Sequence, residues 1–223
     1  MEDREYRYLR EEMVIRYLKR GQIQSPRLAG AMRRVPRELF MEPKFSHLAY
    51  LDRPIPIPHS KGDFTPQAFQ HTLFYEALDL LKGDSFLEVG TGSGYGAALA
   101  QEMVGSRGSV VTLEFDVDAY NFSKMCLARA GYHDVIVVNA DGYAGYPEMA
   151  PYDKICVTAS SESIPNELLQ QLKKPGRLVA PIGAKAGLRG QDLMLFKKDR
   201  EGIITEEKLG TVICSPLVSS EEK

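Results

Sequence analysis

The sequence lacks a long hydrophobic run. No apolar stretch approaches the roughly 18 residues that a membrane-spanning helix requires. The first residues, Met1-Glu-Asp-Arg, do not resemble a secretory signal peptide. We therefore expect no membrane partner and a cytoplasmic location.

The sequence also has little net charge. Its 28 lysines and arginines are nearly balanced by 30 aspartates and glutamates, which leaves −2 at pH 7. This balance gives no general reason to expect a nucleic-acid partner, although local basic patches remain compatible with it. A chain of 223 residues with 43% hydrophobic residues is large enough for one α/β domain and a small appendage.

Cysteine is scarce. Cys126, Cys156 and Cys214 are odd in number and far apart, without the spacing of metal ligands. Each lies in an apolar helix or strand pattern, so we expect buried, unreactive thiols and no metal site. Unpaired thiols fit a reducing compartment.

What the sequence does have is a glycine-rich stretch, Phe86-Leu-Glu-Val-Gly-Thr-Gly-Ser-Gly-Tyr95. A short apolar run, a glycine turn and a helical pattern follow one another, as in the first half of a nucleotide-binding βαβ unit. Glycines let the backbone turn sharply and approach a ligand, and the helix directs free N–H groups toward it. We assign the turn to cofactor binding, with residues Gly90, Thr91, Gly92, Ser93 and Gly94.

Two acidic residues distinguish this turn from a dinucleotide site. Glu88 lies two residues before the first glycine, where a carboxylate would repel a pyrophosphate and attract an amine or sulfonium cation. Glu114 closes the apolar run 110–113, about where a ribose-binding carboxylate is expected. The glycine spacing is also G-x-G-x-G rather than G-x-G-x-x-G. Together these features predict S-adenosylmethionine (SAM) as the cofactor.

The first 64 residues differ in pattern from the remainder. Residues 2–20 and 26–34 read as helices, followed by a short turn at 35–40. This helical segment fits either an oligomerisation arm or part of a substrate site. Alternating prolines at 53–58 predict a stiff, extended strap that delivers residues 59–64 to one place. We therefore expect an N-terminal extension and strap at 1–64 and a cofactor-binding unit at 65–223.

From residue 65 onward strands and helices alternate. Thr65-Pro66 is expected to cap and start a helix that runs to about residue 81, with Phe69, Leu73, Ala77 and Leu80 on its buried face. Apolar strands separated by helices predict a mainly parallel sheet with helices on both faces, a Rossmann-like α/β fold. Short strand patterns without long helices between them predict an antiparallel end of the sheet. The expected strands are 85–89, 109–113, 135–139, 153–158, 177–182, 191–197, 203–208 and 211–216, and the expected helices between them are 95–104, 117–130 and 165–173.

Ligands of open parallel sheets bind beyond the C-terminal ends of the strands. Asp141 follows the third strand and could accept a hydrogen bond from an adenine amino group, or simply cap a turn. Phe115 and Gly142, next to the two acids, complete the predicted cofactor site. Thr158 and Ser160 follow the fourth strand, where they could face a second substrate or cap the next helix.

The sequence resembles the protein L-isoaspartate O-methyltransferases over nearly its whole length. Segments that match in family order are Val35-Pro-Arg-Glu-Leu-Phe40, His47-Leu-Ala-Tyr50, Asp52-Arg-Pro54, Glu88-Val-Gly-Thr-Gly-Ser-Gly-Tyr95, Asp141-Gly-Tyr143, Val157-Thr-Ala159, Gly176-Arg-Leu-Val179 and Ser215-Pro-Leu217. The glycine loop is shared by many SAM-dependent methyltransferases, whereas the N-terminal segments are specific. The resemblance implies a repair enzyme that methylates the α-carboxyl group of isoaspartate in damaged proteins or peptides.

The resemblance fails in one place. The family has Gly-His-Gly and then Thr-x-Ser-Gln-Pro before the helix, whereas this chain has Pro58-His-Ser-Lys-Gly-Asp-Phe-Thr-Pro66. Its histidine, His59, is kept, and the resemblance implies roles for His59 and Thr65 in catalysis and for His59, Ser60, Asp63 and Thr158 in acceptor binding. Either Thr65 takes over the role of the family serine, or the acceptor has changed. Because Asp63 would repel an anionic acceptor, a different acceptor or a SAM-binding module with little turnover remains open, and weak turnover on ordinary isoaspartyl peptides is expected.

Overall fold

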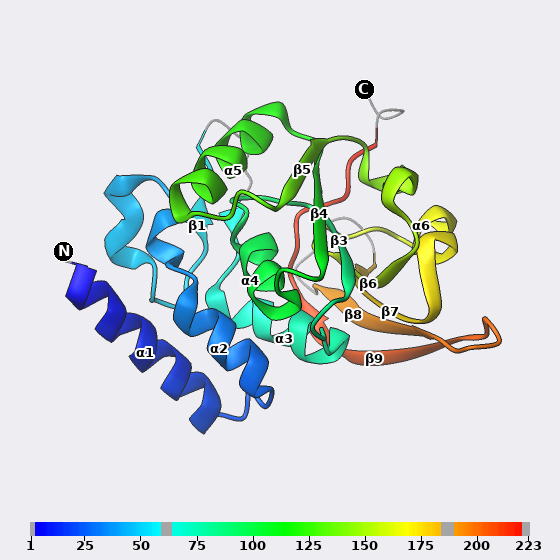
Figure 1. Ribbon diagram of the computed structural model, residues 1–223, viewed down its shortest axis with the longest axis horizontal. Helices are drawn as coiled ribbons and strands as arrows, with labels where there is room; N and C mark the ends of the chain where they lie inside the picture. Colours follow the sequence, from blue (N-terminus) through cyan, green and yellow to red (C-terminus); the bar gives the residue numbers. More distant parts are fainter. Residues whose placement is uncertain (1–2, 59–63, 184–189, 220–223) are drawn as a thin grey trace.

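A seven-stranded sheet forms the centre of the molecule (Figure 1). The structure is a computed structural model, and it describes residues 3–58, 64–183 and 190–219. The strand order is β5-β4-β3-β6-β7-β8-β9. The strands are β3 Ser85–Val89, β4 Ser109–Glu114, β5 Ile136–Asn139, β6 Tyr152–Val157, β7 Leu172–Ile182, β8 Gln191–Lys198 and β9 Ile204–Val212. The first five pair in parallel, and β7, β8 and β9 pair antiparallel. This arrangement confirms the predicted fold class, including the antiparallel end.

The helices begin and end at recognisable local signals. Ser25 accepts a hydrogen bond from the Leu28 amide at the start of α2, and Asp116 accepts two main-chain N–H bonds at the start of α5. The α-helices are α1 Asp3–Lys19, α2 Pro26–Arg34, α3 Ala68–Leu78, α4 Tyr95–Val104, α5 Val117–Ala130 and α6 Asn166–Gln171. Short 3-10 helices are η1 Arg37–Leu39, η2 Pro43–Leu48, η3 Gly142–Ala144 and η4 Pro147–Met149.

Side-chain alternation along the strands divides the core into two clusters. Phe86 and Val110 face the cluster that includes residues of α1 to α5, whereas Leu87 and Val111 face the cluster that includes α6. Each fully buried side chain of this kind contributes about 1.5–3 kcal/mol. The same alternation directs Glu88 toward the first cluster.

The N-terminal helices belong to the first cluster. Met13 and Tyr17 of α1 and Leu28 and Met32 of α2 are buried in the same cluster as residues of α3 and α4. In Figure 1 these helices lie beside α4, at the end of the molecule opposite the β8–β9 hairpin. The helical segment therefore packs against α4, the helix that follows the predicted cofactor loop.

Two sequence-based expectations for α3 are wrong. The helix begins at Ala68 with Gln67 as its N-cap, and Thr65 instead pairs with Ile55 in a two-strand ladder of β1 Ile55–Pro56 and β2 Phe64–Thr65. The buried positions of α3 are Ala68, Thr72, Phe74, Tyr75 and Leu78, whereas the predicted Leu73 is 37% exposed. The other predicted positions do face the core, since Leu80 is fully buried and Phe69 and Ala77 are partly buried against the same cluster.

A further expectation fails at the antiparallel end. The range predicted at 203–208 and the first two residues of the range predicted at 211–216 form one strand, β9, and beyond it Pro216 makes an isolated bridge. Gly210 does not break it, because this glycine pairs with Leu193, where the ladder shifts register before Met194.

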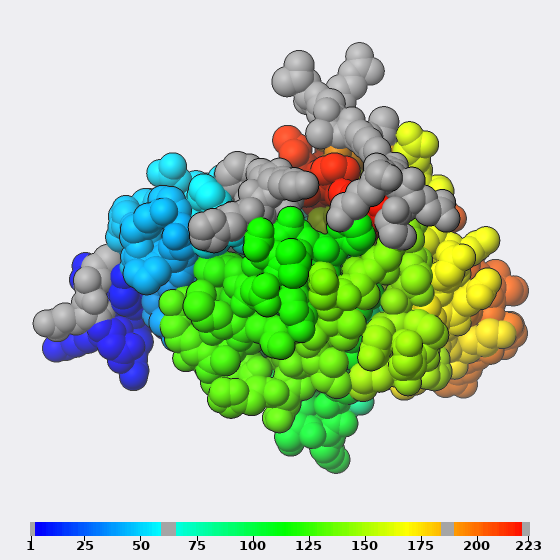
Figure 2. Space-filling view, turned by 90° about the horizontal axis from the view of Figure 1, so that it is seen from above, coloured from blue at the N-terminus to red at the C-terminus, as the bar shows by residue number. Residues whose placement is uncertain are grey.

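The C-terminal segment crosses the ends of the parallel strands. Ser160 forms an isolated parallel bridge with Pro216, and the Leu217 amide donates to the Ser160 carbonyl oxygen at 2.7 Å. Seen from above, this red segment lies between the N-terminal helices on one side and residues around α6 on the other (Figure 2). None of the helices that the structure describes is both long enough and apolar enough to cross a bilayer.

Candidate active site

The glycine loop lies at the C-terminal end of the central strand β3. Gly90 has a φ of 96°, and a Cβ atom there would lie 2.2 Å from Thr158 Oγ1. The amides of Gly90 and Thr91 donate to the carbonyl oxygen of Leu113 at 2.9 and 3.1 Å. The loop is thereby folded over the end of β4, and α4 starts directly after it. The free N–H groups of the α4 first turn consequently lie at the edge where ligands of such sheets bind.

The remainder of the loop is enclosed by neighbouring side chains. A Cβ atom on Gly92, whose φ is 55°, would lie 3.5 Å from Ile57 Cδ1, and one on Gly94 would lie 3.0 Å from Leu127 Cγ. Ser93 is buried between these two glycines. The strap segment and helix α5 therefore hold the loop from two sides.

Glu114 is tied directly to the loop. Its carboxylate accepts hydrogen bonds from the Gly92 amide at 2.9 Å and from the Asp116 amide at 3.1 Å. Such charge-assisted bonds are among the stronger ones in proteins. The carboxylate that was predicted to bind ribose is thus fixed in orientation next to the glycines.

Asp141 lies beside Glu114 because β5 pairs with β4. Glu114 pairs with Asn139, two residues before Asp141. The side-chain amide of Asn139 donates to the main-chain carbonyl oxygens of Glu114 and Phe115. Asp141 Oδ1 accepts from the Tyr143 amide at 2.9 Å, so it does cap η3. Gly142 packs against the end of β3, where a Cβ atom would lie 2.4 Å from Val89 Cγ1. The structure therefore brings the predicted adenosine-binding residues together at one edge and gives Asp141 a local capping contact as well.

Glu88 is enclosed between the sheet and α4, with 1% of its surface exposed. Thr112, its partner in β4, donates to Oε2 at 2.8 Å, and the Tyr75 hydroxyl lies 3.3 Å from Oε1. A Cβ atom on Gly96 would lie 2.2 Å from Oε1. Burial raises the pKa of Glu88 to about 8, against the weaker lowering effect of these hydrogen bonds. Its role toward a cationic cofactor stays a prediction.

Hydrogen-bond donors around Glu88 agree with a protonated carboxyl group. The single hydroxyl proton of Tyr75 has a better acceptor in the Gly96 carbonyl oxygen, 2.7 Å away. A proton on Glu88 Oε1 would then complete the contact to the Tyr75 oxygen. Thr91 and Thr112 hydroxyls, 2.8 Å apart, extend this chain to the glycine loop. The buried chain therefore links α3, the sheet and the loop.

Thr158 contacts the glycine loop from the next strand. Its hydroxyl lies 2.8 Å from the Gly90 carbonyl oxygen and 3.1 Å from that of Val89. Ser160 is buried and contacts the Ser215 carbonyl oxygen through its hydroxyl at 3.4 Å. Both residues hold main chain at the site edge, and an acceptor-binding role for Thr158 stays a prediction.

Acceptor-side residues are described only in part. His59, Ser60 and Asp63 lie outside the described residues. For Thr65 the structure gives the main chain, in β2, and the preceding strap residue Ile57 is buried against the glycine loop. The structure thus places Ile57, on the N-terminal side of the strap, beside the cofactor loop.

Sequence reasoning missed one buried residue of this region, Arg37. It is 0% exposed and donates to the carbonyl oxygens of Ala49 and Pro66 at 2.9 and 2.6 Å. Its guanidinium carbon lies 4.8 Å from the ring centroid of Tyr95, the first residue of α4. The segment Val35-Pro-Arg-Glu-Leu-Phe40 was recognised as a family signature, but nothing in its pattern indicated a buried arginine.

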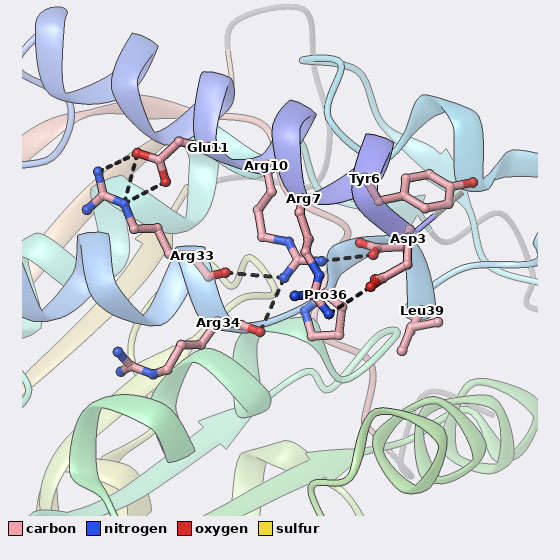
Figure 3. A pocket seen from close by; sticks show the side chains of 10 residues that line it. Asp3, Tyr6, Arg7, Arg10, Glu11, Arg33, Arg34, Pro36 and Leu39 are labelled. Atoms are coloured by element: carbon pink, nitrogen blue, oxygen red, sulfur yellow. Dashed lines mark hydrogen bonds and ion pairs between the residues drawn. The ribbon is translucent and has the colours of Figure 1, made fainter. Parts of the chain in front are cut away.

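A separate groove lies away from this site, between α1 and α2 (Figure 3). It has a volume of about 760 Å³ and is lined by charged side chains. Arg7 pairs with Asp3, and Arg33 pairs with Glu11. Arg10, at its base, donates to the carbonyl oxygens of Arg33 and Arg34 and to Glu38. These contacts give the groove a structural explanation as a helix–helix junction.

Within the part of the chain that the structure describes, no cluster of three or more His, Cys, Asp or Glu side chains could hold a metal ion. Cys126 and Cys156 are buried and Cys214 is partly buried, all as free thiols. Burial raises the pKa of Cys126 to about 11, which disfavours the reactive thiolate.

The fold is that of the SAM-dependent methyltransferases. It has a mixed seven-stranded sheet, a glycine loop at the end of a central parallel strand, and acids at the ends of the next two strands. Two solved structures are similar over more than nine-tenths of the chain. One protein-L-isoaspartate O-methyltransferase has a TM-score of 0.82 and 32% identity, over 93% of this chain and 65% of that one. Another, described as the enzyme from Plasmodium falciparum in complex with S-adenosyl-L-homocysteine, has a TM-score of 0.80 and 22% identity, over 94% and 98%.

The chain belongs to the protein-L-isoaspartate(D-aspartate) O-methyltransferase family, whose model matches residues 9–222. It is 39% identical over 208 residues to the protein-L-isoaspartate O-methyltransferase of Methanococcus aeolicus, covering 93% of each chain. It is 42% identical over 209 residues to that of Methanoculleus marisnigri, covering 94% of this chain and 91% of the relative. The resemblance inferred from the motifs is confirmed.

Proposed function

We propose that this protein transfers a methyl group from SAM to the α-carboxyl group of isoaspartyl residues in proteins or peptides. The observation that carries the proposal is the match of residues 9–222 to the family, which spans both the cofactor loop and the N-terminal signatures. The fixed carboxylate of Glu114 beside Gly92 supports the cofactor half.

The residues at the sheet edge fit the parts of SAM. Glu114 would accept hydrogen bonds from the ribose hydroxyls, and Asp141 would accept one from the adenine amino group. Phe115 and Gly142 would border the adenosine. Support comes from the pairing of β4 with β5, which brings these residues to one edge. The glycine loop, from Gly90 to Gly94, would hold the methionine part against main-chain N–H groups, and buried Glu88 beneath it would supply negative charge when ionised.

Methyl transfer requires alignment rather than a strong base. SAM supplies an electrophilic methyl group on a sulfonium sulfur. A carboxylate acceptor is ionised at neutral pH and carries its own nucleophilic electron pair. What the chain must provide is a near-attack arrangement of the two groups and exclusion of water. Strap residues 59–65 would provide the acceptor side, with His59, Ser60, Asp63 and Thr65 as candidates, and Thr158 at the strand end.

The chain is organised in the same two parts, an acceptor side and a cofactor side. We assign residues 1–64 to an extension that forms the acceptor side and residues 65–223 to the cofactor-binding unit. Contacts between Ile57 and Gly92 support a direct junction between the two. Free, mainly buried cysteines fit a reducing compartment, for which we propose the cytoplasm.

The experiment that tests this function uses labelled SAM and paired peptides that differ only in an isoaspartyl or aspartyl residue. Label should enter the isoaspartyl peptide alone, as a base-labile ester. Absence of label in this peptide, with SAM bound normally, would overturn the proposal.

A second acceptor remains a candidate because the strap sequence differs from the family pattern at Gly62-Asp-Phe64. Asp63→Asn separates the two acceptors. Removal of a negative charge should lower the KM for an isoaspartyl carboxylate, whereas it should impair a cationic acceptor that Asp63 binds. Glu12→Gln, which removes an exposed negative charge of α1 outside the strap, is the control.

A further inference from the structure

Arg37 is a buried cation with an unusual set of partners. Its guanidinium group donates to two neutral main-chain carbonyl oxygens, those of Ala49 and Pro66. Its Nη1 is buried and has no hydrogen-bond partner among the residues that the structure describes. Burial lowers the pKa of the Arg37 guanidinium. A buried guanidinium with an unsatisfied N–H is unfavourable for stability, and such exceptions concentrate at functional sites.

The two carbonyl groups lie at the two ends of one segment. Ala49 precedes residues 50–65, the segment that contains the acceptor strap, and Pro66 follows it. Both flanks of this segment are therefore bonded to one guanidinium group. Within this segment Ile55 and Thr65 pair in the short ladder of β1 and β2. Arg37 therefore closes the base of the strap as a loop.

The same side chain contacts the cofactor side of the site. Its guanidinium carbon lies 4.8 Å from the ring centroid of Tyr95, which directly follows the glycine loop. The Tyr95 ring is held on other sides by Phe40 and His71, with ring centroids at 5.6 and 5.1 Å. Burial and the Arg37 charge lower the pKa of His71 to about 3, so the imidazole is neutral and adds no second charge. Arg37 consequently brings a cation to this ring cluster, and it bridges strap and helix.

We propose that Arg37 is a positioning residue for methyl transfer, which fixes the acceptor strap relative to the glycine loop by bonding both strap ends and lying on Tyr95. This inference rests on the proposed function for its kinetic consequences. A carboxylate oxygen must meet the methyl group in line and at short distance, so a displaced strap lowers the rate of transfer even when both ligands bind. In this proposal Arg37 acts through the strap, because its contacts run to Ala49, Pro66 and Tyr95.

The test compares Arg37→Met and Arg37→Lys with two controls. Methionine keeps an apolar stem on Tyr95 and removes both hydrogen bonds, whereas lysine keeps the charge and can bond one carbonyl group. Arg129→Met is the matched control, because Arg129 also donates to two main-chain carbonyl groups, those of Leu39 and Met41, outside the strap. Met13→Ala, in the buried face of α1, controls for loss of stability alone.

The expected result is a separation of binding from transfer. In single turnover on an isoaspartyl peptide, Arg37→Met should transfer methyl about 10- to 100-fold more slowly, with SAM affinity within about twofold of the unmodified protein. Arg37→Lys should recover part of the rate. Equal slowing in Arg37→Met and in Met13→Ala at matched loss of melting temperature would overturn the proposal.

Hydrogen exchange measured without an acceptor tests the role of Arg37 independently of the proposed function. Amide hydrogen exchange in residues 50–66 should accelerate in Arg37→Met and stay unchanged in Arg129→Met, with α4 protected in both. If the unmodified protein methylates no isoaspartyl peptide, the function fails while this exchange result can still hold. Unchanged exchange in residues 50–66 would refute the positioning role whatever the acceptor is.

Discussion

At the scale of single residues, burial moves the pKa of Glu88 into the usual working pH range. The folded protein, with a Glu88 pKa of about 8 against an ordinary value of 4.5, binds the proton more tightly than the unfolded chain. The stability that this proton contributes is therefore fully present below pH 4.5 and is lost as the pH rises through 8. Within this window the loss is at most about 1.4 kcal/mol per pH unit from this group.

Glu88→Gln should flatten this dependence. The amide has the shape of the protonated carboxyl group and can donate to Tyr75 while accepting from Thr112. The free energy of unfolding, measured by urea titration at several pH values from 5 to 9, should fall less steeply in the variant. Glu12→Gln, at an exposed position of α1, should follow the unmodified protein. Parallel curves for all three proteins would show that Glu88 is ionised in the folded state.

Glu114→Ala tests the cofactor site at the same scale. The change removes a charged acceptor that holds the Gly92 amide, and each lost charge-assisted bond is worth about 1.5–3 kcal/mol. SAM affinity measured by calorimetry should fall at least tenfold.

Asp141→Ala should weaken the binding of adenosine-containing ligands, with little change in the melting temperature of the free protein. A collapse of that melting temperature would make Asp141 chiefly the cap of η3.

How much of the site could be predicted depends on the residue type. Gly90 and Glu114 were found because glycines and acids at strand ends follow directly from the order of strand and helix in the chain. Arg37 was not, because a charged residue is expected at the surface, and its burial depends on carbonyl groups contributed by Ala49 and Pro66, remote in sequence. The opposite error concerned Thr65, whose capping pattern is overridden by pairing with Ile55.

At the scale of elements, helices and buried strands were predicted well where periodicity is regular. The bounds of α4 and α5 agree with the sequence-based ranges, since each has an apolar stripe and clear ends. The two strands expected on either side of Gly210 are one, because a glycine can pass through a ladder at a register shift. A break and a bulge have the same local sequence, and only the pairing partner distinguishes them.

A buried ion pair joins α1 to η1, next to the junction of α1 with α2. Arg10 lies 2.8 Å from Glu38, with side chains 9% and 7% exposed, and also donates to Tyr50. Arg10→Met should lower the free energy of unfolding by about 3–5 kcal/mol, because Glu38 would remain buried without its partner. Denaturant titration gives this value.

Arg10→Met combined with Glu38→Gln is the matching control. With both charges removed, part of the loss should be recovered, and the double-mutant cycle isolates the pair. Arg33→Met, at the more exposed pair with Glu11 in the same groove, should cost no more than about 1 kcal/mol. Strictly additive losses for Arg10 and Glu38 would contradict the coupling.

At the scale of the whole molecule, ligand binding should raise the stability of the folded chain. A ligand at 100 times its Kd adds about 2.7 kcal/mol, which for a chain of this length raises the melting temperature by about 5–10 °C. Thermal denaturation with increasing SAM should show this shift, and Glu114→Ala should show less of it at equal SAM. No shift in the unmodified protein would argue against SAM as a ligand.

The segment that crosses the strand ends has a consequence for biosynthesis. Pro216 bridges to Ser160, and the Leu217 side chain would lie 3.1 Å from a Cβ atom on Gly142, at the predicted adenosine end of the site. These residues leave the ribosome after every strand of the sheet. In a nascent chain this side of the site therefore stays uncovered until the segment after β9 has been made and can pack across the strand ends.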